Sequence, residues 1–570
     1  MVNLSNFYNT LLSIEIAVFS IIVAAIFVFL QLVYTNFSYR QVKFIFRNPY
    51  LLSYFIVSWI DLFITAAGSF CLAVNKTNPV VTNLIFVLLC LILMVFSIAL
   101  FFVLIFKNLG YLEPSKILLL LGQNIKYEPI RNFLFKKYEI KNPAEEREIR
   151  TIFNIEETSE EDDRKLKIDL ERYNRLKEVV KSATDPLEPI NEITIQSINK
   201  ADLKTLNESM ELICEISKKF VSKIPQIDEK NEWNPDSALS NHYADYLVEM
   251  MHAQIEMCER QKLESLKLKV LDTSKIIVNY FIESNHFTAL LTMFNFWKKI
   301  ADNAIGISSQ IFRRIIGYYK EIGEIVFEKQ KKEVLDEVFR DVGWLGERLL
   351  TKKRFEEKPL MFDRDYYTEY DELMECLLHF GYEYRDKHPE LYPLIYFDAI
   401  DVVFLKLVQI FLNDKKNTEI KESLFDCVSV YYSFGEKAII AGNSDGAALA
   451  SMNLKKSYEK LKENNLIDEA KYTIGLLVRI GIVAAAYKDK LAKARFLHKE
   501  LSEWIIEVVE KSEFKDTITH EVFEGYLNFI DMGSHDNLWK FITELGKRMK
   551  TNFGLRFDWK TGEKYPEDDS

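Results

Sequence analysis

The sequence predicts an all-α protein, in which three transmembrane helices precede a cytoplasmic helical-repeat domain of the α-solenoid type. Two observations lead to this prediction. Residues 11–106 contain three apolar runs, each long enough for the about 20 residues with which a helix crosses a bilayer. From about residue 186 onward, apolar residues recur at helical spacing, with few prolines and no alternating strand pattern. An irregular all-helical bundle is the alternative architecture for this second part.

The overall composition limits the class of protein. The 570 residues are too many for one compact core and favour a membrane part joined to a large soluble part. The formal net charge of −11 argues against nucleic acid as a partner, because binding to nucleic acid needs clustered lysine and arginine. The six cysteines are scattered and form no CxxC pair, so we expect free buried thiols rather than disulfides or a zinc site.

The transmembrane domain is predicted over residues 1–112, with helices at about 11–34, 51–74 and 80–106. Basic residues follow the first and third runs, whereas the N-terminus has none and the second break has one. Since cytoplasmic flanks carry the basic excess, we expect the N-terminus outside and the C-terminal domain in the cytoplasm of a cell membrane. A cleaved signal peptide is excluded, because no basic segment or small-residue cleavage site accompanies the first run. The basic residues predicted to contact lipid headgroups are Arg40, Lys43, Arg47, Lys126, Arg131, Lys136 and Lys137.

Polar residues within the predicted spans form a stripe. Ser58, Asp61, Thr65 and Ser69 recur at three- and four-residue spacing in the second run, and Glu15 lies in the first. A charge at mid-bilayer costs roughly 2.5–3.5 kcal/mol on insertion scales, so Asp61 should face other helices or water. Either a neutral Asp61 joins helices through hydrogen bonds, or it lines an ion path. The ion path requires a homo-oligomer, because three helices cannot enclose a pore.

Three short motifs surround the end of the first run, within Leu11–Pro49. They are Phe19–Ser20, Leu30–Gln31–Leu32 and Phe37–Ser38–Tyr39–Arg40. This stretch resembles the start of an uncharacterised family of predicted bacterial integral membrane proteins, a domain of unknown function. Tyr39 stands where that family has proline, and the chain shows three crossings where members often have four. The resemblance implies a membrane protein and supplies no catalytic residue.

Residues 113–185 are predicted to connect the two parts. Glu113–Gln123 is too short an apolar stretch to cross a bilayer, so we expect an interfacial or domain-docking helix there. The acidic tract Glu156–Asp163 is predicted to be a solvated linker, and an amphipathic helix is expected over about 164–182.

The cytoplasmic domain is predicted over residues 186–555 and is followed by a polar tail at 556–570. Five segments share one pattern, in which an apolar helix, a tight polar turn and an amphipathic helix follow one another. Some gaps between the turns have the length of HEAT or armadillo repeats, and such helix pairs stack into solenoids with large binding surfaces. The turns are expected near Ala201, Ser284, Lys329, Gly442 and Lys488.

Three of the predicted first helices contain an apolar–glycine pair that begins seven or eight residues before the turn. Glycine inside a helix costs up to about 1 kcal/mol relative to alanine. Its recurrence at Gly323, Gly435 and Gly481 therefore predicts close approach of a neighbouring helix. Residues 351–393 are rich in tyrosine, phenylalanine and charge, and we interpret them as an insertion on the face that contacts a partner.

One helix stripe has the chemistry of metal ligands. His242, Asp245, Glu249, His252 and Glu256 recur at three- and four-residue spacing, and one pair has the Glu-x-x-His spacing of di-iron bundles. A di-iron site needs a second such motif on a facing helix, and none is predicted there, so the solvent side of an amphipathic helix is the alternative. Phosphate-binding loops are also missing. Gly442–Gly446 (GNSDG) has the composition of an anion-binding nest, but it lies at a predicted turn, where asparagine, aspartate and glycine are expected anyway, and no cofactor is expected.

These features predict an integral membrane protein whose cytoplasmic repeat domain binds a partner or signal, rather than an enzyme. Membrane lipid and a cytoplasmic protein are the expected partners. The alternative is an oligomeric ion channel or membrane-perturbing effector that the helical domain gates.

Overall fold

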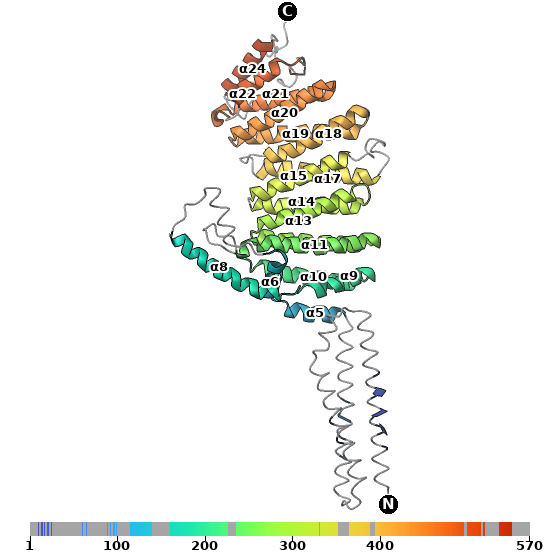
Figure 1. Cartoon of the computed structure of the whole chain (residues 1–570). Coiled ribbons are helices and arrows are strands. Elements are labelled where there is room, and N and C mark those ends of the chain that lie inside the picture. The colour runs from blue at the N-terminus through green and yellow to red at the C-terminus, as the bar shows by residue number, and fades with distance from the viewer. Residues whose placement is uncertain are drawn as a thin grey trace, which may run out of the picture. The chain divides into compact units, whose positions relative to one another are not determined.

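The computed structural model consists of helices, with no strand among the residues that it describes (Figure 1). This agrees with the all-α class predicted from the sequence. Apart from isolated positions, the structure describes residues 114–139, 160–225, 235–329, 331–351, 364–387, 394–494, 499–514 and 535–549. Contacts divide the chain into two compact units, Met1–Thr292 and Met293–Ser570.

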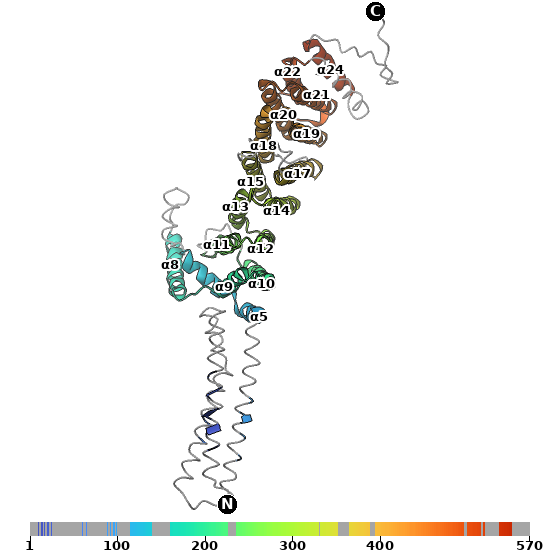
Figure 2. The same ribbon diagram turned by 90° about the vertical axis from the view of Figure 1, so that its right-hand side faces the viewer.

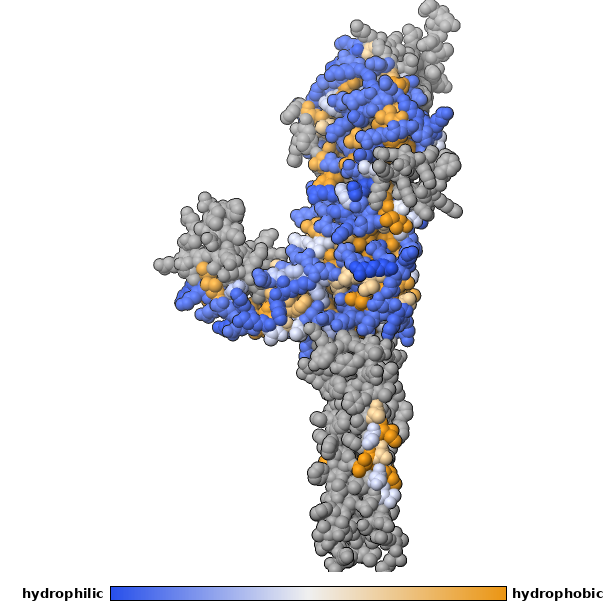
Figure 3. Space-filling model, turned by 45° about the vertical axis from the view of Figure 1, so that its right-hand side comes forward, coloured by the Kyte–Doolittle hydropathy of each residue, from blue (hydrophilic) through white to orange (hydrophobic). Residues whose placement is uncertain are grey.

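The three predicted transmembrane helices fall outside the described residues, except for isolated positions. Each of these positions has helical conformation. Within the described part of the chain, no helix combines the length and the apolarity that crossing a membrane requires. Eight large apolar side chains at the isolated positions are exposed, whereas Ile64 is half-buried. Figure 3 shows hydrophobic (orange) surface among the coloured positions of this part of the chain. The eight exposed side chains are those of Ile14, Ile16, Ile21, Ile60, Leu88, Ile92, Val95 and Phe96.

The first unit is a stack of antiparallel helices. Helices α9 and α11 lie side by side in one layer, and α10 and α12 in the other (Figure 2). Helix α5 packs on α10 and α9, whereas α6 packs on α11 and α8. The bounds are α5 (Pro114–Asn124), α6 (Tyr127–Lys137), α8 (Glu160–Lys181), α9 (Glu188–Asn199), α10 (Leu203–Val221), η2 (Pro235–Ala238), α11 (Leu239–Arg260) and α12 (Glu264–Glu283).

The second unit has the same two-layer arrangement. Helices α15, α18, α20 and α22 form one layer, and α14, α17, α19, α21 and α24 form the other. Helix α13 contains the boundary between the units. The bounds are α13 (Phe287–Ala304), α14 (Ser309–Glu328), α15 (Lys332–Thr351), α17 (Arg364–Lys387), α18 (Leu394–Asn413), α19 (Thr418–Ile440), α20 (Ser444–Glu463), α21 (Ile467–Ala486), η4 (Lys488–Lys490), α22 (Leu501–Glu510) and α24 (His535–Met549).

A three-residue turn recurs between consecutive helices. Its middle residue is left-handed, and the next residue donates its N–H to the carbonyl five positions earlier, as Asn443 does to Ala438 at 2.8 Å. That next residue then precedes the following helix, where the Asn443 side chain accepts from Gly446 N at 2.9 Å. The turn therefore ends one helix and begins the next without a loop. The left-handed residues are Ala201, Lys262, Asn285, Gly442 and Asn465.

The turns predicted near Ala201, Ser284, Lys329 and Gly442 all connect two helices in the structure. The fifth prediction is wrong in part, because no α-helix follows Lys488 directly. Residues 491–494 are not helical, and the next α-helix begins only at Leu501. Helix α21 instead pairs with α20 across the turn at Asn465, a turn that the sequence pattern did not predict.

The segment interpreted as an insertion contains a regular member of the stack. Helix α17 packs between α14 and α19, and its Leu373, Leu377 and Phe380 are at most 1% exposed. The tract predicted as a solvated linker also differs, because α8 begins at Glu160, inside it. Acidic residues favour the positive N-terminal end of a helix dipole, which accounts for this extension.

The three predicted packing glycines each lie against a neighbouring helix. A methyl group built at Gly435 would lie 2.7 Å from Ile480 Cδ1, and one at Gly481 would lie 2.7 Å from Phe541 Cζ. At Gly323 the same methyl group would overlap the Phe380 ring. Glycine thus permits same-layer helices to approach more closely than alanine would.

Helix α14 offers a matched pair of glycines that tests this packing. Gly323→Ala should destabilise the second unit by about 1–3 kcal/mol, because Phe380 is buried and cannot yield without strain. Gly317→Ala should instead stabilise it by about 0.5–1 kcal/mol, since a methyl group there meets no atom within 4 Å. Urea unfolding of both variants measures the difference, and equal effects would contradict the close packing at Gly323.

Candidate functional site

The metal-ligand stripe of α11 is used for contacts with other helices. The Tyr138 ring stacks on His242 with centroids 5.0 Å apart and planes 6° from parallel. Glu249 forms an ion pair with Lys137 and accepts a hydrogen bond from the Tyr138 hydroxyl at 3.2 Å. Asp245 accepts from Thr292 Oγ1 at 3.1 Å. The other two members, His252 and Glu256, lie 3.6 Å apart.

These contacts differ from those of a metal centre. Nowhere in the described ranges do three or more histidine, cysteine, aspartate or glutamate side chains converge as metal ligands must. Two members of the stripe, His242 and Glu249, instead form the polar edge of the contact between α11 and the end of α6, whereas Asp245 bonds Thr292 of α13. Ile130, Leu134 and Phe135 of α6 form the apolar base of that contact and are at most 3% exposed.

Three of the lysines and arginines predicted to meet lipid headgroups have partners within the protein. Arg131 Nε donates to Asp236 Oδ1 at 2.6 Å, Lys136 Nζ donates to the Ala183 carbonyl at 2.8 Å, and Lys137 pairs with Glu249. Lys126 is exposed. Arg40, Lys43 and Arg47 lie outside the described residues, as do Glu15, Ser58, Asp61, Thr65 and Ser69, so the polar stripe and the ion path remain predictions.

A tyrosine–aspartate contact fastens the end of the connector to the first unit. The Tyr246 hydroxyl donates to the carboxylate of Asp185, with 2.9 Å to each oxygen. Asp185 Oδ1 also accepts from the backbone N–H groups of Leu187 and Glu188, at the start of α9. Burial raises the pKa of Tyr246, as does the neighbouring Asp185, so the hydroxyl keeps its proton and remains a donor.

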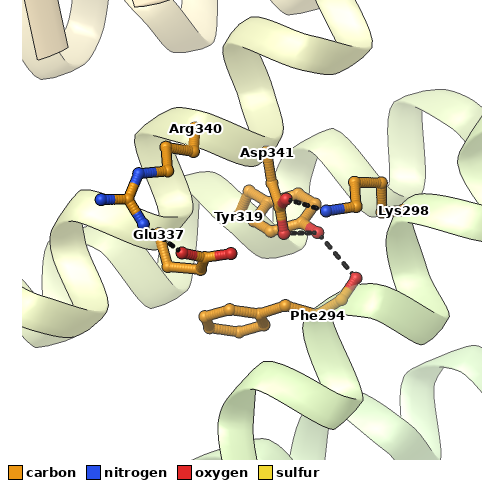
Figure 4. A network of polar contacts seen from close by, with 6 residues as sticks. All are labelled: Phe294, Lys298, Tyr319, Glu337, Arg340 and Asp341. Carbon is orange, nitrogen blue, oxygen red and sulfur yellow. Dashed lines mark hydrogen bonds and ion pairs between the residues drawn. The ribbon is translucent and has the colours of Figure 1, made fainter. Parts of the chain in front are cut away.

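The second unit contains a buried polar network formed by α13, α14 and α15 (Figure 4). Asp341 is 1% exposed and accepts from Lys298 Nζ at 2.6 Å and from the Tyr319 hydroxyl at 2.9 Å. The same hydroxyl lies 3.0 Å from the Phe294 carbonyl. Burial raises the pKa of Asp341, and the hydrogen bonds from Lys298 and Tyr319 offset part of that effect. Both carboxylate oxygens accept a hydrogen bond, so this network joins three helices rather than presenting a free base.

Ion pairs and aromatic side chains follow the outer edge of the layer that contains α14, α17, α19 and α21. Lys320 Nζ of α14 lies 2.8 Å from Glu375 Oε1 of α17, and its hydrogen bond lowers the pKa of Glu375. Lys421 Nζ of α19 lies 3.2 Å from Glu469 Oε1 of α21. The rings of Phe425 and Tyr472 are 4.6 Å apart, and Tyr472 is 39% exposed. This edge has features of a protein-contact surface, because it combines the exposed Tyr472 and the half-buried Phe425 with polar groups.

Four of the six cysteines lie in the described residues, and all four are free and buried, as predicted. They are Cys214, Cys258, Cys376 and Cys427. Burial raises the pKa of Cys214 and of Cys258 to about 11. These thiols therefore stay protonated at neutral pH and are poor nucleophiles.

Removal of the Asp341 carboxylate tests the buried network. Asp341→Ala should destabilise the second unit by about 3 kcal/mol, because it leaves the Lys298 ammonium without its partner in a largely buried site. Glu337→Ala, one turn earlier, removes only an i,i+3 pair with Arg340 and should cost less than about 0.5 kcal/mol. Hydrogen exchange in α13–α15 measures the loss of stability in both variants. A similar loss in Asp341→Ala and Glu337→Ala would show that the buried network does not hold these helices together.

Comparisons with known proteins add little to this description. No protein-family model matches the chain, and no curated protein does. Among solved structures, it is similar to one described as "Circular tandem repeat protein with novel repeat topology and enhanced subunit contact surfaces". The sequences are 16% identical, and the alignment covers 76% of this chain and 97% of that one with a TM-score of 0.32. This likeness is too slight to bear on the function.

Proposed function

We propose that the chain is an integral membrane protein whose helical-repeat body binds a protein partner in the cytoplasm. Membrane insertion is supported by eight large apolar side chains at helical positions within the three runs. Each of them is 44–67% exposed. Exposure of so much apolar surface to water is unfavourable, by about 25 cal/mol for each Å². Lipid removes that cost.

The distribution of basic residues gives the orientation in the membrane. They follow the first and third runs, whereas the N-terminus has none and the second break has one, which supports an outside N-terminus and a cytoplasmic body. The Ser20 hydroxyl, which donates to the Ile16 carbonyl at 2.7 Å, is compatible with lipid, because a hydroxyl in hydrocarbon has no water to bond.

The body is proposed to be an α-solenoid. Its helices contact their hairpin partner and the next helix of the same layer, which is how helical repeats bury their apolar faces. Such stacks present long surfaces that bind proteins. We assign the binding surface to the edge of α19 and α21 around Phe425 and Tyr472, since exposed aromatic residues dominate the energy of protein contacts. A scaffold or sensor anchored to the membrane is the function that follows.

Single cysteines introduced on either side of the second run test the membrane topology. In sealed cells, a membrane-impermeant maleimide should label Thr77→Cys, in the second break, but not Ser38→Cys, in the basic loop. Permeabilisation should make Ser38→Cys reactive while leaving the label on Thr77→Cys unchanged. The native thiols that the structure describes are buried and give a low background. Labelling of both positions, or of Ser38→Cys alone, in sealed cells would contradict the topology.

A photo-crosslinking amino acid placed at Tyr472 tests the binding surface. It should form an adduct with another protein in intact cells, because the side chain is exposed at the centre of the proposed surface. The same group at Glu463, exposed at the end of α20, serves as the control and should give little adduct. Equal amounts of adduct at the two positions, or no adduct at Tyr472, would contradict the assignment of the partner-binding surface to α19 and α21.

A further inference from the structure

Helix α5 has apolar residues on all its sides. Ile117 to Leu121 are five consecutive apolar residues. At about 100° per residue, such a run passes completely around a helix. One neighbouring helix can cover only part of that circumference, so the remainder needs a second apolar environment.

The inner side of α5 is buried in the first unit. Ile117 is 6% exposed and Leu118 is 2% exposed, and the helix packs on α10 and α9. Gly122 lies so close to Leu212 of α10 that an added methyl group would overlap the leucine side chain. This side of α5 is therefore a fixed part of the helical stack.

The outer side of α5 carries Leu119, which is 63% exposed. Only seven residues separate Phe106, the end of the third predicted span, from Pro114, the start of α5. Even a fully extended segment of that length reaches only about 25 Å. The segment also contains Lys107, whose charge suits anionic headgroups. A bilayer that contains the third span is thus within reach of Leu119.

We propose that α5 rests on the cytoplasmic surface of the bilayer, with Leu119 at the boundary between headgroups and acyl chains. Its opposite side stays docked on α10, so α5 holds the α9–α10 end of the first unit against the membrane. The inference depends on the proposed membrane insertion, and it adds a lipid-binding surface that insertion alone does not require.

Spin labelling of the full chain in vesicles tests this position. Cys71 and Cys90, which lie in the second and third predicted spans, are first replaced by alanine. A nitroxide is then attached at Leu119→Cys. The control position is Ile467→Cys on α21, where the native side chain is 42% exposed. The label at residue 119 should collide more often with oxygen and several-fold less often with a water-soluble nickel chelate than the label at residue 467. Equal nickel collisions at the two positions would overturn the proposal, and so would a label at 119 shielded from both reagents, which would indicate cover by protein.

A charge substitution gives a second, independent measurement. Leu119→Asp should leave the chain resistant to carbonate extraction but accelerate hydrogen exchange in α5 by about tenfold or more, because one leucine loses its apolar environment. Gln123→Asp introduces the same charge one turn later without removing an apolar contact, and it should have little effect. Unchanged exchange in Leu119→Asp would overturn the bilayer contact while leaving membrane insertion intact. Extraction of the wild-type chain by carbonate would instead refute the insertion itself.

Discussion

The left-handed residue in five of the described hairpin turns is the constraint on which the stack depends. With a turn of three residues, two consecutive helices must run antiparallel and in contact, so every second helix is parallel and belongs to the same layer. Four of the five left-handed positions are not glycine, although a left-handed backbone costs such a residue roughly 1–2 kcal/mol. The hydrogen bond that closes each turn, such as Leu466 N to the Leu461 carbonyl at 3.0 Å, offsets that cost.

Polar groups inside the two units repeat one solution to the problem of aligning helices. A tyrosine hydroxyl donates to an aspartate in three places: Tyr246 to Asp185, Tyr319 to Asp341, and Tyr431 to Asp401 at 2.5 Å. Burial raises the pKa of each tyrosine, so each remains a donor at any physiological pH. Leucine contacts allow helices to slide past one another, whereas the Tyr319 and Tyr431 pairs each fix one register between two helices. The Tyr246 pair fixes the segment before α9 on α11. Their role is therefore specificity of packing more than net stability.

Local signals explain which parts of the fold could be predicted. The turn at Gly442 combines asparagine, glycine and aspartate, and that composition predicts it directly. The turns at Lys262 and Asn465 were not predicted. A lysine gives no sign of a left-handed backbone, whereas asparagine tolerates one, so the pair Asn464–Asn465 was an available signal. Residues 351–393 were predicted to be an insertion because they are rich in charge and tyrosine. Helix α17, which lies within them, nevertheless buries one face as its neighbours do.

The candidate sites were harder to predict, because their partners are remote in sequence. The residues of the α11 stripe are suitable metal ligands, but Glu249 pairs with Lys137, more than a hundred residues earlier. The network at Asp341 joins three helices through side chains that carry no motif. The buried free cysteines follow from the chemistry of single residues, and the packing glycines from their recurrence in the repeat, so both could be predicted from the sequence.

The recurring turn also determines how such a chain can change in length. The left-handed residues Lys262 and Asn285 are 23 positions apart, and so are Gly442 and Asn465. Gain or loss of two such intervals inserts or removes a whole hairpin and restores the original direction of the chain. Each layer then meets a helix of the same orientation as before, and only contacts between adjacent hairpins need to be rebuilt. Duplication of a short stretch of gene could therefore lengthen the surface in steps of one hairpin, and a deletion in the same frame could shorten it.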